Sequence, residues 1–513
     1  MTELVAHRPV RVRAAPSPTG AAHVGNAYIA LFNLAFARRH GGHFVMRIED
    51  TDRARSRKKY EERLYAGWRW LGLHWDEGPD VGGNVGPYRQ SERSEIYHEH
   101  ARQLMDAGHA YYSFITPEEL AAWRDKGQRE GEPAPYEAER DADPVMAQAR
   151  AKSGEVSVIR MKSPREGTCV FTDAFRGEIR IGYDQVDDQV LLKSDGFPTY
   201  HLAVVVDDHL MGITHVIRGE DWIPSTPKHM LLYEHFGWEA PMHAHLPLLL
   251  NPDGTKMSKR RNPTSIDYYR RAGYLPQTML NYMALMAYPP APSTNNAGDG
   301  EEKFSFDNFV ERFELENVNL GGSVFDLDKL SWLNGRYLRE ELSEKQLGEA
   351  LRHWALNDEY IGRILPLMQS RMETLGDFMP HCSFFFARSV DPKIEDLVPK
   401  KREASEVAKV LQTAVWSLEC VEPWSRDAVE VALRRIAEFW DWPIRDVTRP
   451  MYSAVMGQPV GPPLYESIVL LELDLTRTRL LAAMETLGGV SKKKARGLEK
   501  DWNGSGSRRS GVS

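Results

Sequence analysis

The sequence has little of several features that would point to particular classes of protein. Its 513 residues hold three cysteines, Cys169, Cys382 and Cys420, with no paired or metal-ligand spacing. This favours a reduced protein and gives no disulfide framework. No apolar run approaches the length of about 20 residues that spans a bilayer, and the first residues lack the apolar stretch of a signal peptide. We therefore expect a cytoplasmic protein with no membrane partner.

The sequence also lacks an internal repeat of fixed period, which excludes solenoid folds. Its formal net charge is −8, so there is no overall positive charge for coating nucleic acid. A nucleic-acid partner needs only a local basic face, and residues 53–59, 256–261 and 492–496 are candidates. Hydrophobic residues at 42% and charged residues at 27% are ordinary for globular chains. A chain of this length predicts several domains.

The first informative motif is a strand that turns sharply into a helix. An alternating segment at 10–15 is followed by Pro16-Ser17-Pro18-Thr19-Gly20-Ala21-Ala22-His23-Val24-Gly25-Asn26, and then by a helical pattern at about 27–39. Such a turn places backbone N–H groups and the His23 imidazole at the positive end of the helix. The motif therefore predicts a site for an anion such as a triphosphate.

The second motif is a loop far downstream, Asn251-Pro252-Asp253-Gly254-Thr255, which leads into Lys256-Met257-Ser258-Lys259-Arg260. Two lysines three positions apart on such a loop can close over phosphates. Their ammonium groups can balance the charge that develops on a leaving pyrophosphate. Either motif alone is most often an ordinary surface connection, but their joint occurrence favours nucleotide chemistry.

The two motifs resemble the nucleotide-binding signatures of class I aminoacyl-tRNA synthetases. His23-Val24-Gly25-Asn26 is a variant of His-Ile-Gly-His, and residues 256–260 match the Lys-Met-Ser-Lys loop. The stretch at 13–20, with Arg47-Ile48-Glu49-Asp50-Thr51-Asp52, is similar to the bacterial glutamyl-tRNA synthetases. This resemblance extends over nearly the whole chain and implies ligation of L-glutamate to tRNA(Glu) with ATP and Mg²⁺. It also implies that bound tRNA is needed before glutamate is activated.

The resemblance implies a role for each matching residue. His23, Lys256 and Lys259 are the expected catalytic residues, and Arg13 and Glu49 are the expected grips on the glutamate side-chain carboxylate and amino group. Arginine suits a carboxylate because its planar fork binds both oxygens. The expected ATP-binding residues are Pro16, Ser17, Thr19, Gly20, His23, Gly25, Asn26, Asp221, Lys256, Met257, Ser258, Lys259 and Arg260. The expected glutamate-binding residues are Arg13, Ala15, Ser17, Glu49, Tyr200 and Arg218. Arg371 is the expected tRNA contact.

Three positions depart from the family pattern. Some relatives hold zinc through cysteines in the inserted domain, but the matching segment here has Ser113 and Ile115. A thiolate site is not available there, so we expect no zinc or other protein-held metal. Asn26, after Gly25, is a polar exchange. Ala22 stands where a proline is expected before His23, which loosens the turn slightly.

The expected fold is α/β and multidomain. A Rossmann-type parallel-sheet catalytic domain (1–87 and 200–252) is split by an inserted α+β domain (88–199), and a stem-contact domain (253–334) carries the lysine loop. A helical anticodon-binding region (335–500) and a disordered tail (501–513) follow. Within this scheme Tyr200 to Asp208, an apolar run that ends in carboxylates, predicts a buried parallel strand. Ser343-Glu344-Lys345-Gln346 predicts a capped helix start.

Several other functions fit less well. A glutaminyl-tRNA synthetase would need no cation for its neutral amide, and its tRNA-reading half is usually a β-barrel. A truncated relative that charges a modified base would lack the helical half, and so would a small-molecule adenylyl transferase. A degenerate tRNA-binding paralogue predicts loss of His23, Lys256 or Lys259, and all three are present. A non-discriminating enzyme that also charges tRNA(Gln) remains open. We expect a monomer.

Overall fold

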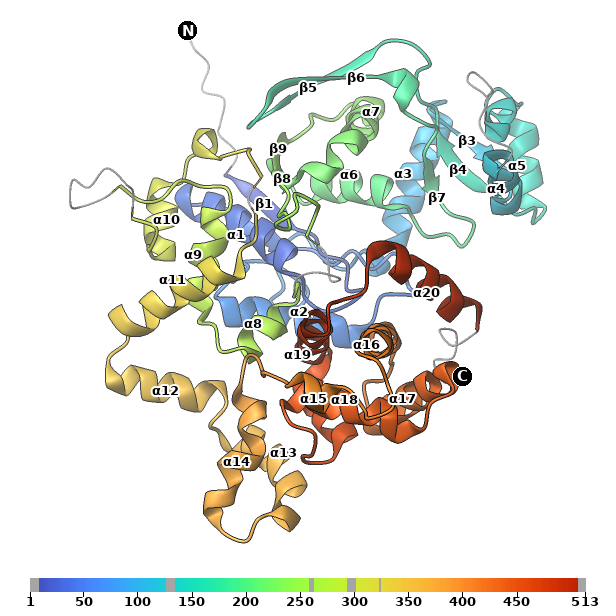
Figure 1. Cartoon of the computed structure of the whole chain (residues 1–513). Helices are drawn as coiled ribbons and strands as arrows, with labels where there is room; N and C mark the ends of the chain where they lie inside the picture. The colour runs from blue at the N-terminus through green and yellow to red at the C-terminus, as the bar shows by residue number, and fades with distance from the viewer. Residues whose placement is uncertain (1–8, 126–133, 258–262, 293–300, 323, 506–513) are drawn as a thin grey trace. The chain divides into compact units, whose positions relative to one another are not determined.

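The chain divides into two compact units, which are described separately. The first comprises Met1–Met257 and Pro276–Leu327, and the second Ser258–Leu275 and Asp328–Ser513. The computed structural model describes residues 9–125, 134–257, 263–292, 301–322 and 324–505 (Figure 1).

The core of the first unit is a set of parallel strands. These are β1 (Arg11–Ala14), β2 (His43–Met46), β8 (His215–Gly219) and β9 (Met242–Leu246). β1 pairs in parallel with β2, and β8 pairs in parallel with β9. The backbone N–H of Thr214 donates to the carbonyl of Arg11 at 2.9 Å, which joins the two pairs side by side. The expected α/β class with a parallel sheet is therefore confirmed.

The turn from β1 into α1 (Val24–Arg39) forms as the sequence predicts. His23 is the N-cap residue, and its Nδ1 accepts a hydrogen bond from the backbone N–H of Gly25 at 2.9 Å. Nearly every side chain from Ala27 to Ala37 is buried, because α1 packs against the strands on one side and against α9 (Pro276–Leu285) and α10 (Phe306–Arg312) on another. The helix is thus fixed firmly, and with it the turn at its start.

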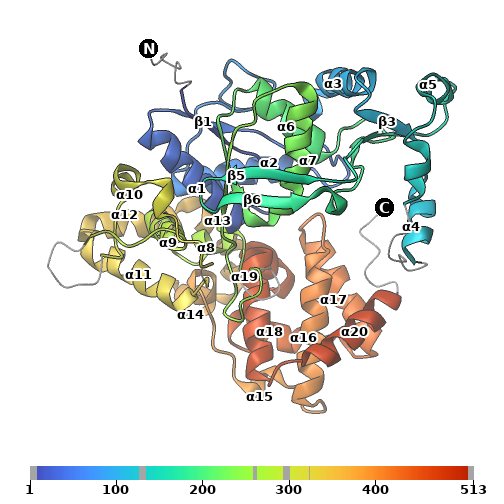
Figure 2. The same ribbon diagram turned by 90° about the horizontal axis from the view of Figure 1, so that it is seen from above.

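The segment between residues 110 and 192 of the first unit contains antiparallel strands. β3, β4 and β7 form one sheet, while β5 and β6 form a hairpin that joins β9 through the pair Asp173–His243. Figures 1 and 2 show this hairpin extending across α6 (Tyr200–Leu210) and α7 (Thr226–Phe236). The bounds are β3 (Ala110–Ser113), β4 (Val158–Met161), β5 (Thr168–Asp173), β6 (Gly177–Gly182) and β7 (Val190–Leu192). The hairpin, expected within the inserted domain, therefore extends the sheet of β8 and β9.

The expected strand from Tyr200 to Asp208 is wrong, because this segment is the helix α6 (Tyr200–Leu210). Its apolar residues are buried all along the run, and a short run that is apolar on every side does not reveal its period. Asp207 and Asp208 lie near the carboxyl end of this helix, where buried arginines hold them. The remaining helices of this unit are α2 (Lys58–Leu71), α3 (Ser94–Asp106), α4 (Pro117–Asp125), α5 (Pro144–Lys152), α7 (Thr226–Phe236), α9 (Pro276–Leu285) and α10 (Phe306–Arg312).

The described part of the second unit is helical, as the sequence predicts. Its longer helices α16 to α19 pack on one another (Figure 2). Its helices are α8 (Ile266–Arg271), α11 (Leu327–Glu340), α12 (Glu344–Trp354), α13 (Asp358–Met368), α14 (Phe378–Cys382), α15 (Ile394–Leu397), α16 (Ala404–Glu419), α17 (Arg426–Trp440), α18 (Ile444–Met456), α19 (Leu464–Thr486) and α20 (Lys492–Gly504). The capping box at Ser343 and Gln346 is present at the start of α12.

The expected disordered tail from residue 501 is wrong at its start, because α20 continues to Gly504. Trp502 is fully buried, and its ring packs edge-on against Phe439 at 5.0 Å between centroids. A large apolar side chain buried in this way stabilises the helix by about 1.5–3 kcal/mol. Residues 506–513, the rest of the expected tail, lie outside the described residues.

Candidate active site

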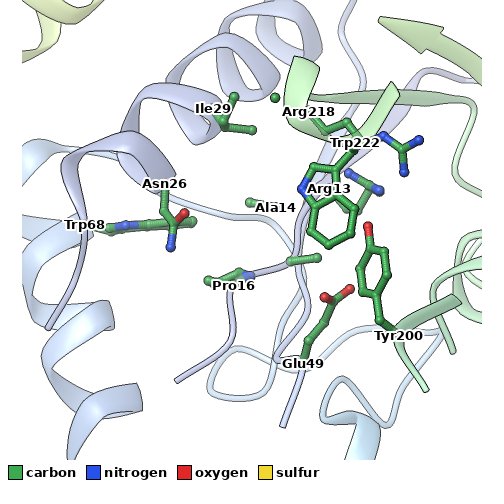
Figure 3. A pocket seen from close by; sticks show the side chains of 12 residues that line it. Arg13, Ala14, Pro16, Asn26, Ile29, Glu49, Trp68, Tyr200, Arg218 and Trp222 are labelled. Carbon is green, nitrogen blue, oxygen red and sulfur yellow. The ribbon is translucent and has the colours of Figure 1, made fainter. Parts of the chain in front are cut away.

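A cavity of about 120 Å³ opens where β1, β2 and β8 end in the first unit. The carboxyl edge of a parallel sheet is where open α/β folds bind ligands. The cavity is lined by Arg13, Ala14, Ala15, Pro16, Asn26, Ile29, Glu49, Trp68, Tyr200, Arg218, Gly219 and Trp222 (Figure 3). Five of the six residues expected to bind glutamate are in this set, namely Arg13, Ala15, Glu49, Tyr200 and Arg218. The sixth, Ser17, is exposed and outside the lining.

The polar groups gather at one end of the cavity. Figure 3 shows the side chains of Arg13, Glu49, Tyr200 and Arg218 close together, with Trp68 across the cavity from them. The Tyr200 ring packs against the Trp222 ring at 4.3 Å between centroids. Burial raises the pKa of Tyr200 to about 12, so its hydroxyl remains a neutral hydrogen-bonding group.

Arg13 is part of a buried network of charges. Its Nε lies 3.1 Å from Oδ1 of Asp208, and the same oxygen accepts from Nη1 of Arg47 at 2.7 Å. Arg47 also donates to Oε1 of Glu49 at 3.3 Å. Burial alone would raise the pKa of Asp208, but Arg13 and Arg47 hold it below its ordinary value. Arg13 is therefore fixed at the cavity wall by a carboxylate of its own chain.

Glu49 supplies the carboxylate that lines the cavity. Burial raises its pKa to about 7, against the opposing effect of Arg47 and Arg13. A substrate ammonium group beside it would favour the charged form and offset this desolvation. The expected role of Glu49, binding an amino group, is chemically consistent with this position.

Arg218 differs from Arg13 because its direct partners are uncharged. It is 5% exposed and donates to Nε2 of His245 at 3.0 Å, to Nδ1 of His229 at 3.1 Å and to Oγ1 of Thr226 at 2.8 Å. Burial lowers its pKa. A buried cation at a cavity wall with neutral neighbours is suited to bind an anion.

The residues expected to bind ATP are distributed around the start of α1 and the second loop. Pro16 and Asn26 line the cavity, Ser17 and Thr19 are exposed, and Gly20 is half-buried. A Cβ at position 25 would lie 3.0 Å from Nδ1 of His23, so a side chain there would press on this cap. The arrangement leaves the start of a 16-residue helix beside the cavity.

The lysine loop is described only as far as Met257, which is buried. Gly254 has a φ of 75°, which turns the chain so that Leu250 bridges to Lys256. Nζ of Lys256 lies 2.7 Å from Oδ2 of Asp221. Ser258, Lys259 and Arg260 lie outside the described residues, so their expected roles remain predictions.

Two further expectations concern the tRNA and a metal. Arg371 is exposed at the end of the short helix Gln369–Arg371 in the second unit, and its role remains a prediction. Oγ of Ser113 donates to Oε2 of Glu139 at 2.8 Å. Among the residues that the structure describes, no group of three histidine, cysteine or acidic side chains is arranged to hold a metal ion.

Sequence reasoning missed several residues of the site. Arg47, Asp207 and Asp208 form its buried charge network, while Trp68 and Trp222 form its aromatic walls. The signal for Arg47 was its place two residues before Glu49 on the same strand end. The two aspartates stand out in the sequence as carboxylates at the end of an apolar run. Because that run was expected to be a strand, their contacts with the arginines could not be predicted.

Comparison with known proteins agrees with this geometry. The family of class I tRNA synthetases (E and Q), catalytic domain, matches residues 9–332, and an anticodon-binding domain matches residues 346–484. A glutamate–tRNA ligase of Marinobacter nauticus is 47% identical over 493 residues, covering 96% of this chain and 99% of that protein. A glutamate–tRNA ligase of Cellvibrio japonicus is 49% identical over 492 residues, covering 96% of both.

Solved structures give the same result. The crystal structure of a glutamate–tRNA ligase from Elizabethkingia meningosepticum, in complex with its amino acid, is 33% identical with a TM-score of 0.62, and the alignment covers 94% of this chain and all of that one. The chain therefore belongs to the class I tRNA synthetases (E and Q), and within them to the glutamate–tRNA ligase family. No helix in the described part of the chain is long and apolar enough to cross a membrane.

Proposed function

We propose that this protein activates L-glutamate with ATP and transfers it to the 3′ end of tRNA(Glu). A glutamate carboxylate oxygen attacks the α-phosphorus of ATP, and the bond to pyrophosphate breaks. The terminal ribose hydroxyl of the tRNA then attacks the carbonyl carbon of glutamyl-adenylate and AMP leaves. The observation that carries the proposal is Arg218, a buried cation in the cavity whose direct partners are all neutral.

The charges of the cavity complement those of glutamate. Arg218 and Arg13 supply cations for carboxylates, and Glu49 supplies the anion for the ammonium group. Arg13 already binds Asp208 through Nε and Nη2, which leaves Nη1 for a substrate. Holding both ends of the amino acid orients its reacting carboxylate, and orientation is a large part of catalysis in such a step.

ATP fits at the start of α1, where backbone N–H groups favour phosphate. Lys256 and Lys259 would then bind the phosphates from the lysine loop, and Mg²⁺ would neutralise part of their charge. Mg²⁺ is usually held by substrate phosphates with one or two carboxylates, and Asp221 is a carboxylate beside this loop. His23 would contact the nucleotide from the helix cap.

The helical second unit would bind the tRNA, with Arg371 as the proposed anticodon contact. The proposed working state is a cytoplasmic monomer, which light scattering with and without tRNA would check.

The decisive test is aminoacylation of purified tRNA(Glu) and tRNA(Gln) side by side, with labelled glutamate and labelled glutamine. Glutamate attached to tRNA(Glu) supports the proposal, and no glutamate on either tRNA overturns it. Glutamate on both tRNAs would identify a non-discriminating enzyme.

A further inference from the structure

The surroundings of Arg218 fix the protonation of the histidines beside it. A guanidinium can only donate hydrogen bonds, so the ring nitrogens that face it, Nδ1 of His229 and Nε2 of His245, must accept. Both imidazoles are therefore neutral. Burial, with the Arg218 charge second, lowers the pKa of His229 well below its ordinary value, in agreement with this geometry.

Each neutral ring carries its hydrogen on the nitrogen that faces away from Arg218 and donates a hydrogen bond from there. Nε2 of His229 then carries the hydrogen and donates to Nδ1 of His201 at 3.1 Å. Nδ1 of His245 donates to Oδ2 of Asp173 at 2.5 Å. The side chains come from α6, α7, β9 and the end of β5, so four elements of the first unit converge behind Arg218 on β8. Only the outermost member, Asp173, is an acid.

The donor count of Arg218 shows what remains for a ligand. Of its five N–H groups, three are taken by His245, His229 and Thr226. The Tyr200 hydroxyl also hydrogen-bonds with the guanidinium and, because a guanidinium only donates, it takes a fourth N–H. The remaining N–H belongs to a side chain that lines the cavity, where it can donate to a carboxylate oxygen.

The neighbouring arginines are held in the opposite way. Arg13 and Arg47 contact Asp208 directly, and Arg93 contacts Asp207 at 2.7 Å. A carboxylate in contact weakens the field that an arginine presents to a ligand. An imidazole nitrogen fixes the guanidinium equally well but leaves its full charge for the cavity.

We propose that His229 is a positioning residue for substrate choice: as a neutral acceptor it orients Arg218 without neutralising it, so that the site prefers a carboxylate to the corresponding neutral amide. This inference rests on the proposed function. It assigns the preference for glutamate over glutamine to the uncharged state of a residue behind the arginine, as well as to the arginine itself.

The test compares two substitutions of nearly equal shape and different charge. His229→Gln supplies another neutral acceptor, whereas His229→Glu supplies an anion at the same place. KM for glutamate and KI for glutamine as a competitor are measured in glutamylation of tRNA(Glu), with kcat and KM for ATP alongside. His229→Glu should raise KM for glutamate roughly 10- to 100-fold, with a much smaller change in KI for glutamine. His229→Gln should keep the ratio of the two constants near that of the wild type.

A second pair covers the case in which His229→Glu fails to fold, as judged by circular dichroism. Thr226→Asp and Thr226→Asn repeat the comparison at the other terminal nitrogen, and only the aspartate should lower the preference for glutamate. Equal ratios for the anionic and neutral members of a folded pair would overturn the inference. A wild-type enzyme that glutamylates no tRNA would instead overturn the proposed function.

Discussion

Arg13 and Asp208 form an ion pair in which each side chain is only 4% exposed. The pair joins the end of β1 to α6, two elements 195 residues apart in sequence. Asp208 keeps Arg47 as a partner when Arg13 is removed, whereas removal of Asp208 would leave buried Arg13 without its counter-charge, a loss of about 3–5 kcal/mol in comparable pairs. Arg13 therefore has a structural role in addition to the substrate contact that the sequence predicts.

Arg13→Ala should lower kcat/KM for glutamate steeply, because a bound carboxylate loses a cation worth about 2–5 kcal/mol in comparable pairs. Glutamine has no charge to neutralise there and should lose less, while KM for ATP should change little. Arg11→Ala is the matched control, since Arg11 lies on the same strand, pairs with Glu77 at 2.7 Å and does not line the cavity. Steady-state kinetics with both amino acids decide the matter, and equal losses for glutamate and glutamine would make Arg13 purely structural.

Lys259→Ala should slow adenylate formation by roughly 100-fold or more, as expected when one preorganised charge is removed from a transition state. Binding of tRNA should change far less. Lys256 should behave similarly, because its pair with Asp221 is exposed and such pairs contribute only about 0–1 kcal/mol, so phosphates can displace it. Lys345→Ala, an exposed lysine of α12 outside the candidate basic segments, is the control. An unchanged single-turnover rate for Lys259→Ala would remove the loop from the mechanism.

Local patterns predicted the elements whose signals are local. The Pro/Gly turn predicted the β1–α1 junction with His23 at the helix start, and Ser343 with Gln346 predicted the cap of α12. Five of the six glutamate-binding residues that the family resemblance implies line one cavity.

Long-range contacts explain what the sequence did not predict. The run from Tyr200 is apolar on all sides, so its own pattern does not distinguish a helix from a strand. The contacts that favour the helix are its burial among neighbouring elements and the ion pairs of its aspartates with Arg13, Arg47 and Arg93. The end of α20 reads as low complexity, yet it is anchored by Trp502 on Phe439, more than sixty positions earlier. Neither contact can be predicted from the residues of its own segment alone.

Zinc content gives a direct check of the departures at Ser113 and Ile115. These side chains cannot supply thiolates, so purified protein should contain no stoichiometric zinc. Elemental analysis after dialysis would measure it, and a chelator should leave the thermal transition unchanged. One zinc per chain, or unfolding on chelation, would contradict this expectation.

His201 should make stability depend on pH. Burial lowers its pKa from 6.5 to about 4, so between these values the unfolded chain binds a proton that the folded chain does not. Stability should therefore fall as pH decreases from 6.5 towards 4. Replacement by neutral asparagine should remove this loss of stability, which amounts to about 2–3 kcal/mol across the window. Glu49, with its pKa raised to about 7, contributes an opposite slope. The difference between wild type and His201→Asn, measured by denaturant unfolding at several pH values, isolates the histidine. Parallel curves would mean that His201 titrates normally.

Glu472→Gly should stabilise the second unit. Glu472 has φ 64° and ψ 170° within α19, a region that is essentially restricted to glycine and costs other residues about 1–3 kcal/mol. Glycine removes this strain but loses a partly exposed ion pair with Arg271 at 3.6 Å, worth about 0–1 kcal/mol. It also adds roughly 0.5–1 kcal/mol of chain entropy to the unfolded state. The balance favours the variant by about 0.5–1 kcal/mol.

The matched control is Glu472→Ala, which loses the same ion pair and keeps the strained backbone. It should unfold at a lower temperature than the wild type, and the glycine variant at a higher one. Calorimetry of the full chain measures both. If both variants lose stability equally, the contacts of the Glu472 side chain outweigh the strain of its backbone. The carboxylate beside Arg271 would then be what maintains the kink in α19.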